Sequence, residues 1–339
     1  MKSKILYIQC ILILLVYLIG NNMPNKKVKY YRDMVQAKNN VKILFKEIKN
    51  KKEELGIVFD KKLDINNTGL IGEEYTGMTT TMGDLDSKRL STNSNFAPYF
   101  IKLFKENNLK EGDLVFVNMS SSFPGINLSL ISALDTLNLK GILVNSIGSS
   151  MYGANNEEFT FLEMNKYLYN KGLIKNKVSA YSWGGDWDIG GNFLPEVKLK
   201  IEERIKDYKI KIFYNKNLQG NLKERCNYYD SFGKPKLFIN IGGNLLFQKL
   251  MKTYEDKGVK TISVLNLKFY ASKLGLSIKE KDNIENIPIY YKSRKNIFQI
   301  IIIFIFIIGL IIFRKLRWRF VKITPNLTFK RMCGIISMY

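Results

Sequence analysis

The chain has 339 residues, 46% of them hydrophobic, which is enough to build a full core in one or two domains. Its formal charge of +23 comes from lysines spread along the whole sequence, with no zinc-finger, RRM or helix-turn-helix signature, so we expect no nucleic-acid partner. The absence of histidine excludes Ser-His-Asp and Cys-His nucleophiles and His-ligated metal sites, and the three cysteines show no CxxC spacing, so no metal site is expected.

Both ends of the chain have the composition of membrane segments. The apolar run 5–19 follows a basic start and precedes no small-residue cleavage site, so residues 1–24 are predicted to be an uncleaved membrane anchor. The run 297–313 is almost wholly Ile and Phe and is bracketed by cations, which predicts a second transmembrane helix over 293–319, with residues 320–339 as a tail. The basic tail favours a cytoplasmic end, which leaves the main domain extracytoplasmic.

Between these segments, residues 25–54 alternate lysines with an apolar stripe at helical spacing and predict a basic amphipathic helix. Such a helix docks its apolar side on a domain, and a basic helix near a membrane can also contact lipid head groups. The α/β domain is then expected over residues 55–292.

A polar stretch over 70–96 follows this helix and is too rich in Gly, Thr, carboxylates and cations to be a core element. It is either a long connection or a binding or catalytic loop. Lys88 and Arg89 could satisfy Asp84 and Asp86 or could bind a carboxylate-bearing ligand, Arg89 in a bidentate manner. The hydroxyls next to them that could add donors are Thr79, Thr80 and Thr81.

The rest of the domain alternates short apolar runs with helical patterns. The runs at 113–118, 140–145, 178–183, 209–214, 237–240 and 261–265 predict buried strands, and the intervening segments predict helices. This alternation predicts a Rossmann-like α/β fold with an open, mostly parallel sheet. Several strand ends open into loops of Ser, Gly, Asn and Asp, and such ends line the ligand crevice of an open α/β sheet.

These loops supply the remaining candidate residues. The serines 120–122 stand before a helix, where they could contact an anion, act as a cap or provide a nucleophile. Asp186, with Asp188 and two tryptophans, could bind a cation or act in acid/base catalysis, or belong to a tight structural loop. Neither GxGxxG nor GxxxxGK[ST] occurs, so no nucleotide or other cofactor is expected.

Four stretches together carry a family resemblance. They are GLIGEEYTGMTTTMGDLDSKRLSTNSNFA (69–97), NMSSSFPGINLS (118–129), SIGSSMYGAN (146–155) and NIGGN (240–244). With the framing anchors, they resemble the poly-gamma-glutamate system protein family, membrane-anchored components of bacterial poly-γ-glutamate synthesis and export. The likeness covers roughly residues 55–275 and implies a role beside the synthase and export membrane proteins. It implies no catalytic residues.

Two principal hypotheses follow. In the first, the chain is an accessory protein that binds or guides the anionic polymer, and the binding residues are Thr79, Thr80, Thr81, Lys88, Arg89, Ser120, Ser121 and Ser122. In the second, it is an amide-bond hydrolase or transferase acting on that polymer or on cell-wall material. Ser121 or a threonine would then be the nucleophile, and the base would be Lys88, Glu74 or Asp186. A purely structural partner of the synthase remains a third possibility.

Overall fold

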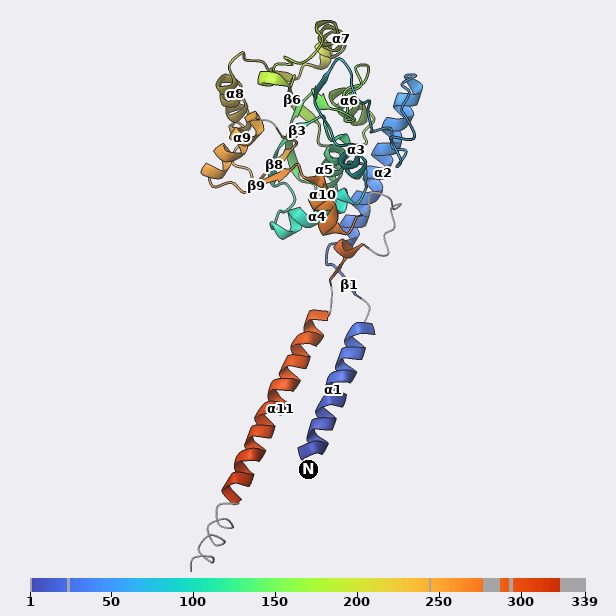
Figure 1. Cartoon of the computed structure of the whole chain (residues 1–339). Helices are drawn as coiled ribbons and strands as arrows, with labels where there is room; N and C mark the ends of the chain where they lie inside the picture. The colour runs from blue at the N-terminus through green and yellow to red at the C-terminus, as the bar shows by residue number, and fades with distance from the viewer. Residues whose placement is uncertain (1, 23–24, 244, 277–286, 293–294, 324–339) are drawn as a thin grey trace, which may run out of the picture. The chain divides into compact units, whose positions relative to one another are not determined.

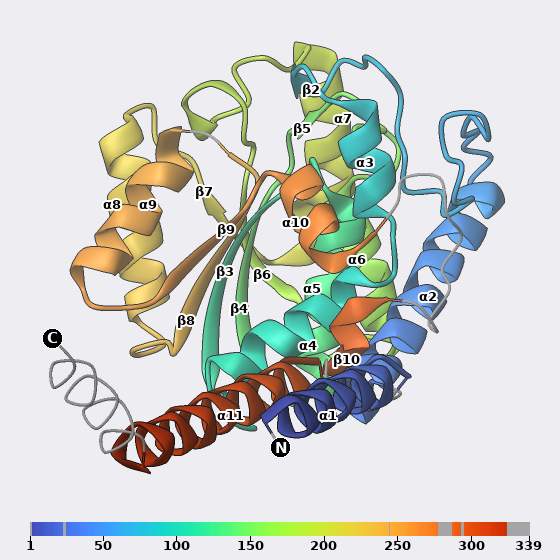
Figure 2. The same cartoon turned by 60° about the horizontal axis from the view of Figure 1, so that its bottom comes forward.

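The computed structural model describes residues 2–22, 25–243, 245–276, 287–292 and 295–323. The chain divides into two compact units: residues 29–290 form one, and the two ends, 1–28 and 291–339, form the other. The larger unit is an α/β domain built on a six-stranded sheet in which all neighbours are parallel (Figures 1 and 2). This confirms the predicted parallel α/β architecture.

The strands of the sheet, in spatial order, are β7 (Lys211–Phe213), β6 (Val178–Ser182), β4 (Lys140–Ser146), β3 (Leu114–Ser120), β8 (Leu237–Ile241) and β9 (Thr261–Val264). The chain builds outward from β3 in one direction as far as β7 and then returns to add β8 and β9 on the other side. The order therefore reverses between β3 and β8. In open α/β sheets the connections that leave the two strands at such a reversal run to opposite faces of the sheet, which leaves a crevice outside the carboxyl ends of the strands.

Helices cover both faces of the sheet (Figure 2). The helices of the domain are α2 (Tyr31–Glu54), α3 (Leu85–Ser91), α4 (Phe96–Glu106), α5 (Pro124–Thr136), α6 (Phe161–Asn170), α7 (Pro195–Ile205), α8 (Leu218–Asp230), α9 (Leu245–Asp256) and α10 (Leu267–Leu274), with 3₁₀ turns at η1 (Asp186–Asp188), η2 (Lys206–Tyr208) and η3 (Pro288–Tyr290). α8 and α9 pack on one face through a core of aromatic rings, among them Phe116, Tyr229, Phe238 and Tyr254.

On the other face, α5 is buried from Pro124 to Leu134, because α2 and α4 pack over it. That double cover explains why the α5 sequence is apolar on nearly every side. The predicted amphipathic helix is α2, and it buries its apolar stripe, including Met34, Val41 and Ile48, against the domain.

The polar stretch 70–96 is more structured than the predicted loop. Thr79–Thr81 form β2, which pairs in parallel with β5 (Ser149–Ser150). A helix, α3, follows, and its N-cap residue Asp84 accepts a hydrogen bond from the Ser87 backbone N–H. The sequence pattern did not predict α3, because this short helix has no long run of apolar residues at helical spacing. Its first turn is instead stabilised by the carboxylate of its N-cap residue, Asp84.

The unit formed by the chain ends contains α1 (Lys2–Asn22), α11 (Lys295–Ile323) and an antiparallel pair of two-residue strands, β1 (Lys26–Lys27) and β10 (Tyr291–Lys292). α1 and α11 pack against each other, and Gln9 donates a hydrogen bond to the Ile305 carbonyl. Within the described residues, Phe298–Lys315 is the helical segment long and apolar enough to cross a membrane, while α1 holds a shorter apolar run, Tyr7–Asn22. The predicted tail lies outside the described residues from 324 onward.

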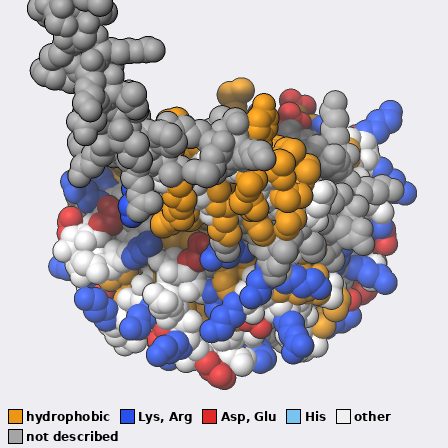
Figure 3. Space-filling model, turned by 90° about the horizontal axis from the view of Figure 1, so that it is seen from below, with side chains coloured by type: hydrophobic (Ala, Val, Ile, Leu, Met, Phe, Trp, Pro, Cys, Tyr) orange, Lys and Arg blue, Asp and Glu red, His pale blue; other side chains and the backbone are white. Residues whose placement is uncertain are grey.

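Surface charge follows the lysine-rich sequence. On the face drawn in Figure 3 the Lys and Arg side chains occur at many places around the surface, beside both hydrophobic and other atoms. The net charge of +23 therefore does not by itself mark a binding site.

Candidate functional site

A cavity of about 530 Å³ opens at the carboxyl edge of the sheet, where the strand order reverses between β3 and β8. Its floor is made by residues at three strand ends: Ser120 of β3, Ser146 of β4 and Gly242 after β8. Its other walls come from the β2–α3 segment, from Gly184–Asp186 and from Phe247 and Leu265. The strand-end loops predicted to converge do so, and the polar stretch lies over them.

Close packing at the floor requires glycine at position 242. Gly242 has φ +96, and a Cβ there would lie 2.8 Å from the Cβ of Ser120. A side chain would therefore both strain the backbone and collide with Ser120 at the end of the neighbouring strand. Glycine at position 242 thus lets the chain leave β8 close to Ser120 at the floor of the cavity.

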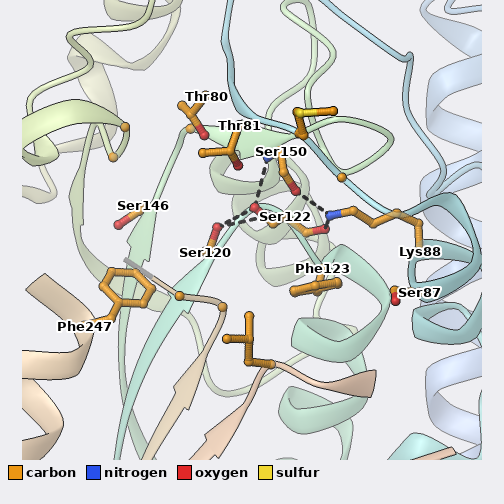
Figure 4. A pocket seen from close by; sticks show the side chains of 18 of the residues that line it. Thr80, Thr81, Ser87, Lys88, Ser120, Ser122, Phe123, Ser146, Ser150 and Phe247 are labelled. Atoms are coloured by element: carbon orange, nitrogen blue, oxygen red, sulfur yellow. Dashed lines mark hydrogen bonds between the residues drawn. The ribbon is translucent and has the colours of Figure 1, made fainter. Parts of the chain in front are cut away.

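Lys88 enters this cavity from α3 with its side chain almost fully buried, at 2% exposure (Figure 4). Its Nζ lies 2.7 Å from the Ser150 Oγ, contacts the Ser122 carbonyl oxygen and stands 4.1 Å from the centre of the Phe123 ring. Burial disfavours the charged form and lowers the pKa of Lys88 from 10.5 to about 7, against a smaller opposing effect of Asp84. Near neutral pH a large fraction of Lys88 is therefore an uncharged amine, which can accept a proton.

Ser150 is held in place by a short chain of hydrogen bonds. Its backbone N–H donates to the Ser122 Oγ at 3.0 Å, and the Ser120 Oγ donates to the same oxygen at 2.8 Å (Figure 4). The backbone of Ser149 and Ser150 is also held in place, because β5 pairs in parallel with β2. Ser150 thereby presents its hydroxyl to a buried amine at the wall of a cavity, which is the arrangement of a serine nucleophile with a lysine base.

The structure brings several predicted residues together at this cavity. Those that line it are Thr80, Thr81, Lys88, Ser120, Ser122 and Asp186. Asp186 is exposed at the rim, and its carboxylate accepts a hydrogen bond from Asn192 Nδ2 at 3.0 Å. These six predicted residues therefore lie together around one cavity at the carboxyl ends of the strands.

The structure directs other predicted residues elsewhere. Ser121 is fully buried and donates its hydroxyl proton to the Ser146 carbonyl at 2.8 Å, so it does not face the cavity as a nucleophile would. Thr79 is also buried and accepts hydrogen bonds from the Thr76 backbone and from Asn155. Glu74 is exposed and lies outside the cavity lining, so it does not stand near Lys88 as a base.

Arg89 departs most clearly from its predicted place. Its Nε donates to the Leu63 carbonyl and its Nη2 to the Lys62 carbonyl, both at 2.9 Å. A further contact at 3.6 Å joins it to Asp86. On a helix, consecutive residues point about 100° apart, so α3 cannot turn both Lys88 and Arg89 into one cavity. Arg89 instead fastens the 60–65 loop to α3.

Sequence reasoning missed two features of the site. Ser150 lies in the SIGSSMYGAN stretch, but no local signal distinguished it from the neighbouring serines. The second is Arg225, which is fully buried and forms an ion pair with Asp188 at 2.6 Å. Asp188 also accepts a hydrogen bond from Ser182 at 2.8 Å, and Arg225 donates to the Asn118 carboxamide oxygen. This network lies under the cavity and holds the ends of β3 and β6.

Asp188 also anchors a strained turn. Trp187 and Asp188 both have positive φ, 58° and 65°, a conformation that a bulky side chain adopts at a cost. Trp187 is nonetheless 63% exposed beside Asp186. The DWD segment is therefore a tight structural loop that displays one carboxylate and one indole and buries the other carboxylate. Within the described chain, no three Cys, Asp or Glu side chains group as metal ligands would.

Comparison with known proteins adds little to this geometry. No family model matches the chain, and no curated protein matches it. The crystal structure of O-ureido-L-serine synthase aligns with 62% of this chain at 14% identity, and the aligned part spans 60% of that protein. Its TM-score is 0.18, too low for that likeness to support an argument about this chain.

Proposed function

We propose that this chain is an acyl-transfer enzyme that cleaves or transfers amide bonds, with Ser150 as nucleophile and Lys88 as general base. The observation that carries the proposal is the 2.7 Å approach of the Ser150 hydroxyl to a buried lysine amine in a cavity at the sheet reversal. A lysine activates serine only when it is uncharged, and burial supplies that condition here.

The proposed steps conserve protons and bonds. The Ser150 Oγ attacks the amide carbonyl carbon while its proton passes to the Lys88 Nζ. When the C–N bond breaks, the same Nζ returns the proton to the departing amine, leaving an acyl group on Ser150. Water or a second amine then attacks the acyl carbon, again with Lys88 accepting the proton, and Ser150 is released with its hydroxyl restored.

Binding of a polyanion in this cavity is less well supported. Of the described residues that line it, Lys88 is the only cation, and two carboxylates, Asp84 and Asp186, line the same space. An uncharged Lys88 would contribute no positive charge, and Arg89 is directed away. With one lysine and two carboxylates, the cavity lacks the positive charge that a groove for many carboxylates would need. Its lining suits a catalytic site that holds a short segment of substrate.

The family resemblance suggests the biological setting of this proposal. The substrate would be poly-γ-glutamate or cell-wall material, and the partners would be the membrane proteins that make and export the polymer. The membrane attachment would use two spans, α1 and α11, with the α/β domain on the extracytoplasmic side; the apolar segment Phe298–Lys315 supports one of them. An impermeant thiol reagent should label a Tyr75→Cys variant more strongly than the parent protein on intact cells; a difference that appears only after lysis would contradict this orientation.

The enzymatic proposal is tested on the full-length protein in detergent. We expect shortening of poly-γ-glutamate, or release of amine from cell-wall peptides, to fall about a thousandfold or more in Ser150→Ala and in Lys88→Met. Ser121→Ala is the matched control, since its hydroxyl is buried against a carbonyl, and it should retain most of the activity. Unchanged turnover in Ser150→Ala would refute the proposal, as would the absence of an acyl adduct on Ser150 in mass spectra of rapidly quenched reactions.

A further inference from the structure

A second hollow, of about 430 Å³, lies beside the serine–lysine cavity, and we call it the side hollow. The two spaces adjoin, because Gly185 and Asp186 line both of them. The first turn of α9 also borders both, since Leu246 lines the side hollow and Phe247 lines the cavity. A substrate in the cavity therefore has the side hollow directly next to it. The rest of the lining is Trp187, Asp188, Leu218 and Leu245.

The lining of the side hollow is largely apolar, and its large side chains are open to solvent. Trp187 is 63% exposed and Leu245 is 57% exposed. They come from two segments, the η1 turn and the start of α9, and Leu218 adds a third apolar side chain from α8. Single exposed apolar residues are common on protein surfaces, but three that meet at one hollow are typical of a binding site.

The exposed indole of Trp187 is held in place at a conformational cost. Trp187 has φ 58, in the left-handed region that a bulky residue rarely adopts. The turn is fixed on both sides of this residue, because the Trp187 carbonyl accepts a hydrogen bond from Asn221 Nδ2 at 3.1 Å and Asp188 forms the buried ion pair with Arg225. Strained backbone that surrounding contacts hold in this way clusters at ligand-binding sites. The strain and the exposure together point to a ligand contact for this indole.

The charges around the side hollow disfavour an anionic occupant. Asp186 is exposed and stands where the side hollow meets the cavity. The described residues that line the side hollow include no Lys or Arg, and Arg225 already pairs with Asp188. A carboxylate that entered would therefore meet the charge of Asp186 without a compensating cation, whereas an uncharged apolar group would not.

We propose that the side hollow is a specificity subsite for an aromatic or branched aliphatic side chain next to the amide bond that Ser150 attacks. The assignment rests on the proposed function for the position of that bond. The apolar group would pack against the Trp187 indole and Leu245, and the side hollow is large enough, since small-molecule pockets span roughly 300 to 1,000 Å³. Asp186 would select against a glutamate side chain at this position. The side hollow therefore favours peptides with apolar side chains over a polymer of glutamate.

The test uses ¹⁹F NMR to measure binding of N-acetyl-4-fluorophenylalanine amide to the full-length protein in lipid nanodiscs. A Ser150→Ala background prevents cleavage from affecting the result. Trp187→Gly and Leu245→Ala should each weaken binding about fivefold or more, because each removes apolar surface that the ring would cover. The matched control, Leu199→Ala, removes a leucine of similar exposure, 66%, from α7 and should change the affinity less than about twofold. Thermal unfolding of each variant verifies that the domain stays folded.

Competition by unlabelled N-acetyl amides measures which side chain the side hollow prefers. The leucine amide should compete about tenfold better than the glutamate amide. Asp186→Asn should narrow that difference about threefold or more, because it removes the negative charge and keeps a side chain of the same size.

Two results would overturn the assignment directly. Equal affinities for the leucine and glutamate amides would show that the side hollow does not select apolar groups, and equal losses in Leu245→Ala and Leu199→Ala would show that the probe binds elsewhere. Tighter binding of N-octanoylglycine amide, lost in the same variants, would replace the side chain by a fatty acyl chain as the occupant.

Failure of the subsite and failure of the proposed function give different results. If the probe binds with the expected preferences and the protein with Ser150 intact cleaves no amide, the binding assignment stands and the proposed function fails. If that protein cleaves amides with glutamate and leucine side chains equally well, the proposed function stands and the subsite assignment fails.

Discussion

The burial of Lys88 predicts a pH dependence of stability that a Lys88→Met variant removes. The pKa of Lys88 falls from 10.5 to about 7 on folding because the amine is desolvated between Phe123 and the serine loops. Below about pH 7 both the folded and the unfolded chain hold the proton, and burial of the charge destabilises the fold by a constant amount. Between about 7 and 10.5 only the unfolded chain holds it, so the stability contributed at this position rises with pH.

The magnitude follows from the slope of this linkage. Each pH unit inside that window adds about 1.4 kcal/mol to the free energy of unfolding. From about pH 7.5 to about pH 9.5, wild type should therefore gain about 3 kcal/mol relative to Lys88→Met. Lys52, whose burial lowers its pKa to about 8, titrates in both proteins, so its contribution cancels from the difference.

The assay is urea unfolding of both full-length proteins in detergent at the two pH values, followed by the fluorescence of the buried Trp183. Lys88→Arg serves as a second comparison, because arginine stays charged and should be destabilised at both pH values. If the difference between wild type and Lys88→Met is the same at the two pH values, the amine is not desolvated as the structure places it. The proposal of a neutral lysine base would fail with it.

Three further predictions concern the same region. Activity assigned to Ser150 should rise with pH through about 7, as the Lys88 amine loses its proton; a profile that falls over this range would contradict its role as base. Asp188→Asn should destabilise the domain by about 3–5 kcal/mol, because Arg225 would remain buried without its counter-charge, and a double variant with Arg225→Met should cost less than the sum of the single changes in urea unfolding. Trp187→Gly should raise the melting temperature, since glycine relieves about 1 kcal/mol of strain at φ 58, and a lower melting temperature would show that the exposed indole contributes to stability.

Much of the architecture could be predicted from the sequence. Short apolar runs ending in Ser, Gly and Asn predicted parallel strands whose carboxyl ends meet, and the sheet order places β3 and β8 at that meeting point. Strand alternation also bears on the serines. Because side chains along a strand point to opposite faces in turn, Ser120 and Ser122 share the cavity side and Ser121 turns inward. The rule separates Ser121 from its two neighbours, but the tertiary structure decides which of the two sides faces the cavity.

Other features depend on contacts that sequence patterns do not encode. Ser150 and Lys88 are 62 positions apart, and their approach requires both the pairing of β5 with β2 and the short helix α3. Arg225 and Asp188 are 37 positions apart and come together only because α8 covers the loop after β6.

Composition and periodicity by themselves determined that this chain has a parallel α/β domain and a segment apolar enough for a membrane. The chemistry was decided by the tertiary structure. Local sequence could not show that α3 turns Lys88 into a cavity and Arg89 toward backbone carbonyls, because that depends on the phase of one short helix. Nor could it show which lysine is desolvated, because desolvation is a property of everything packed around an amine.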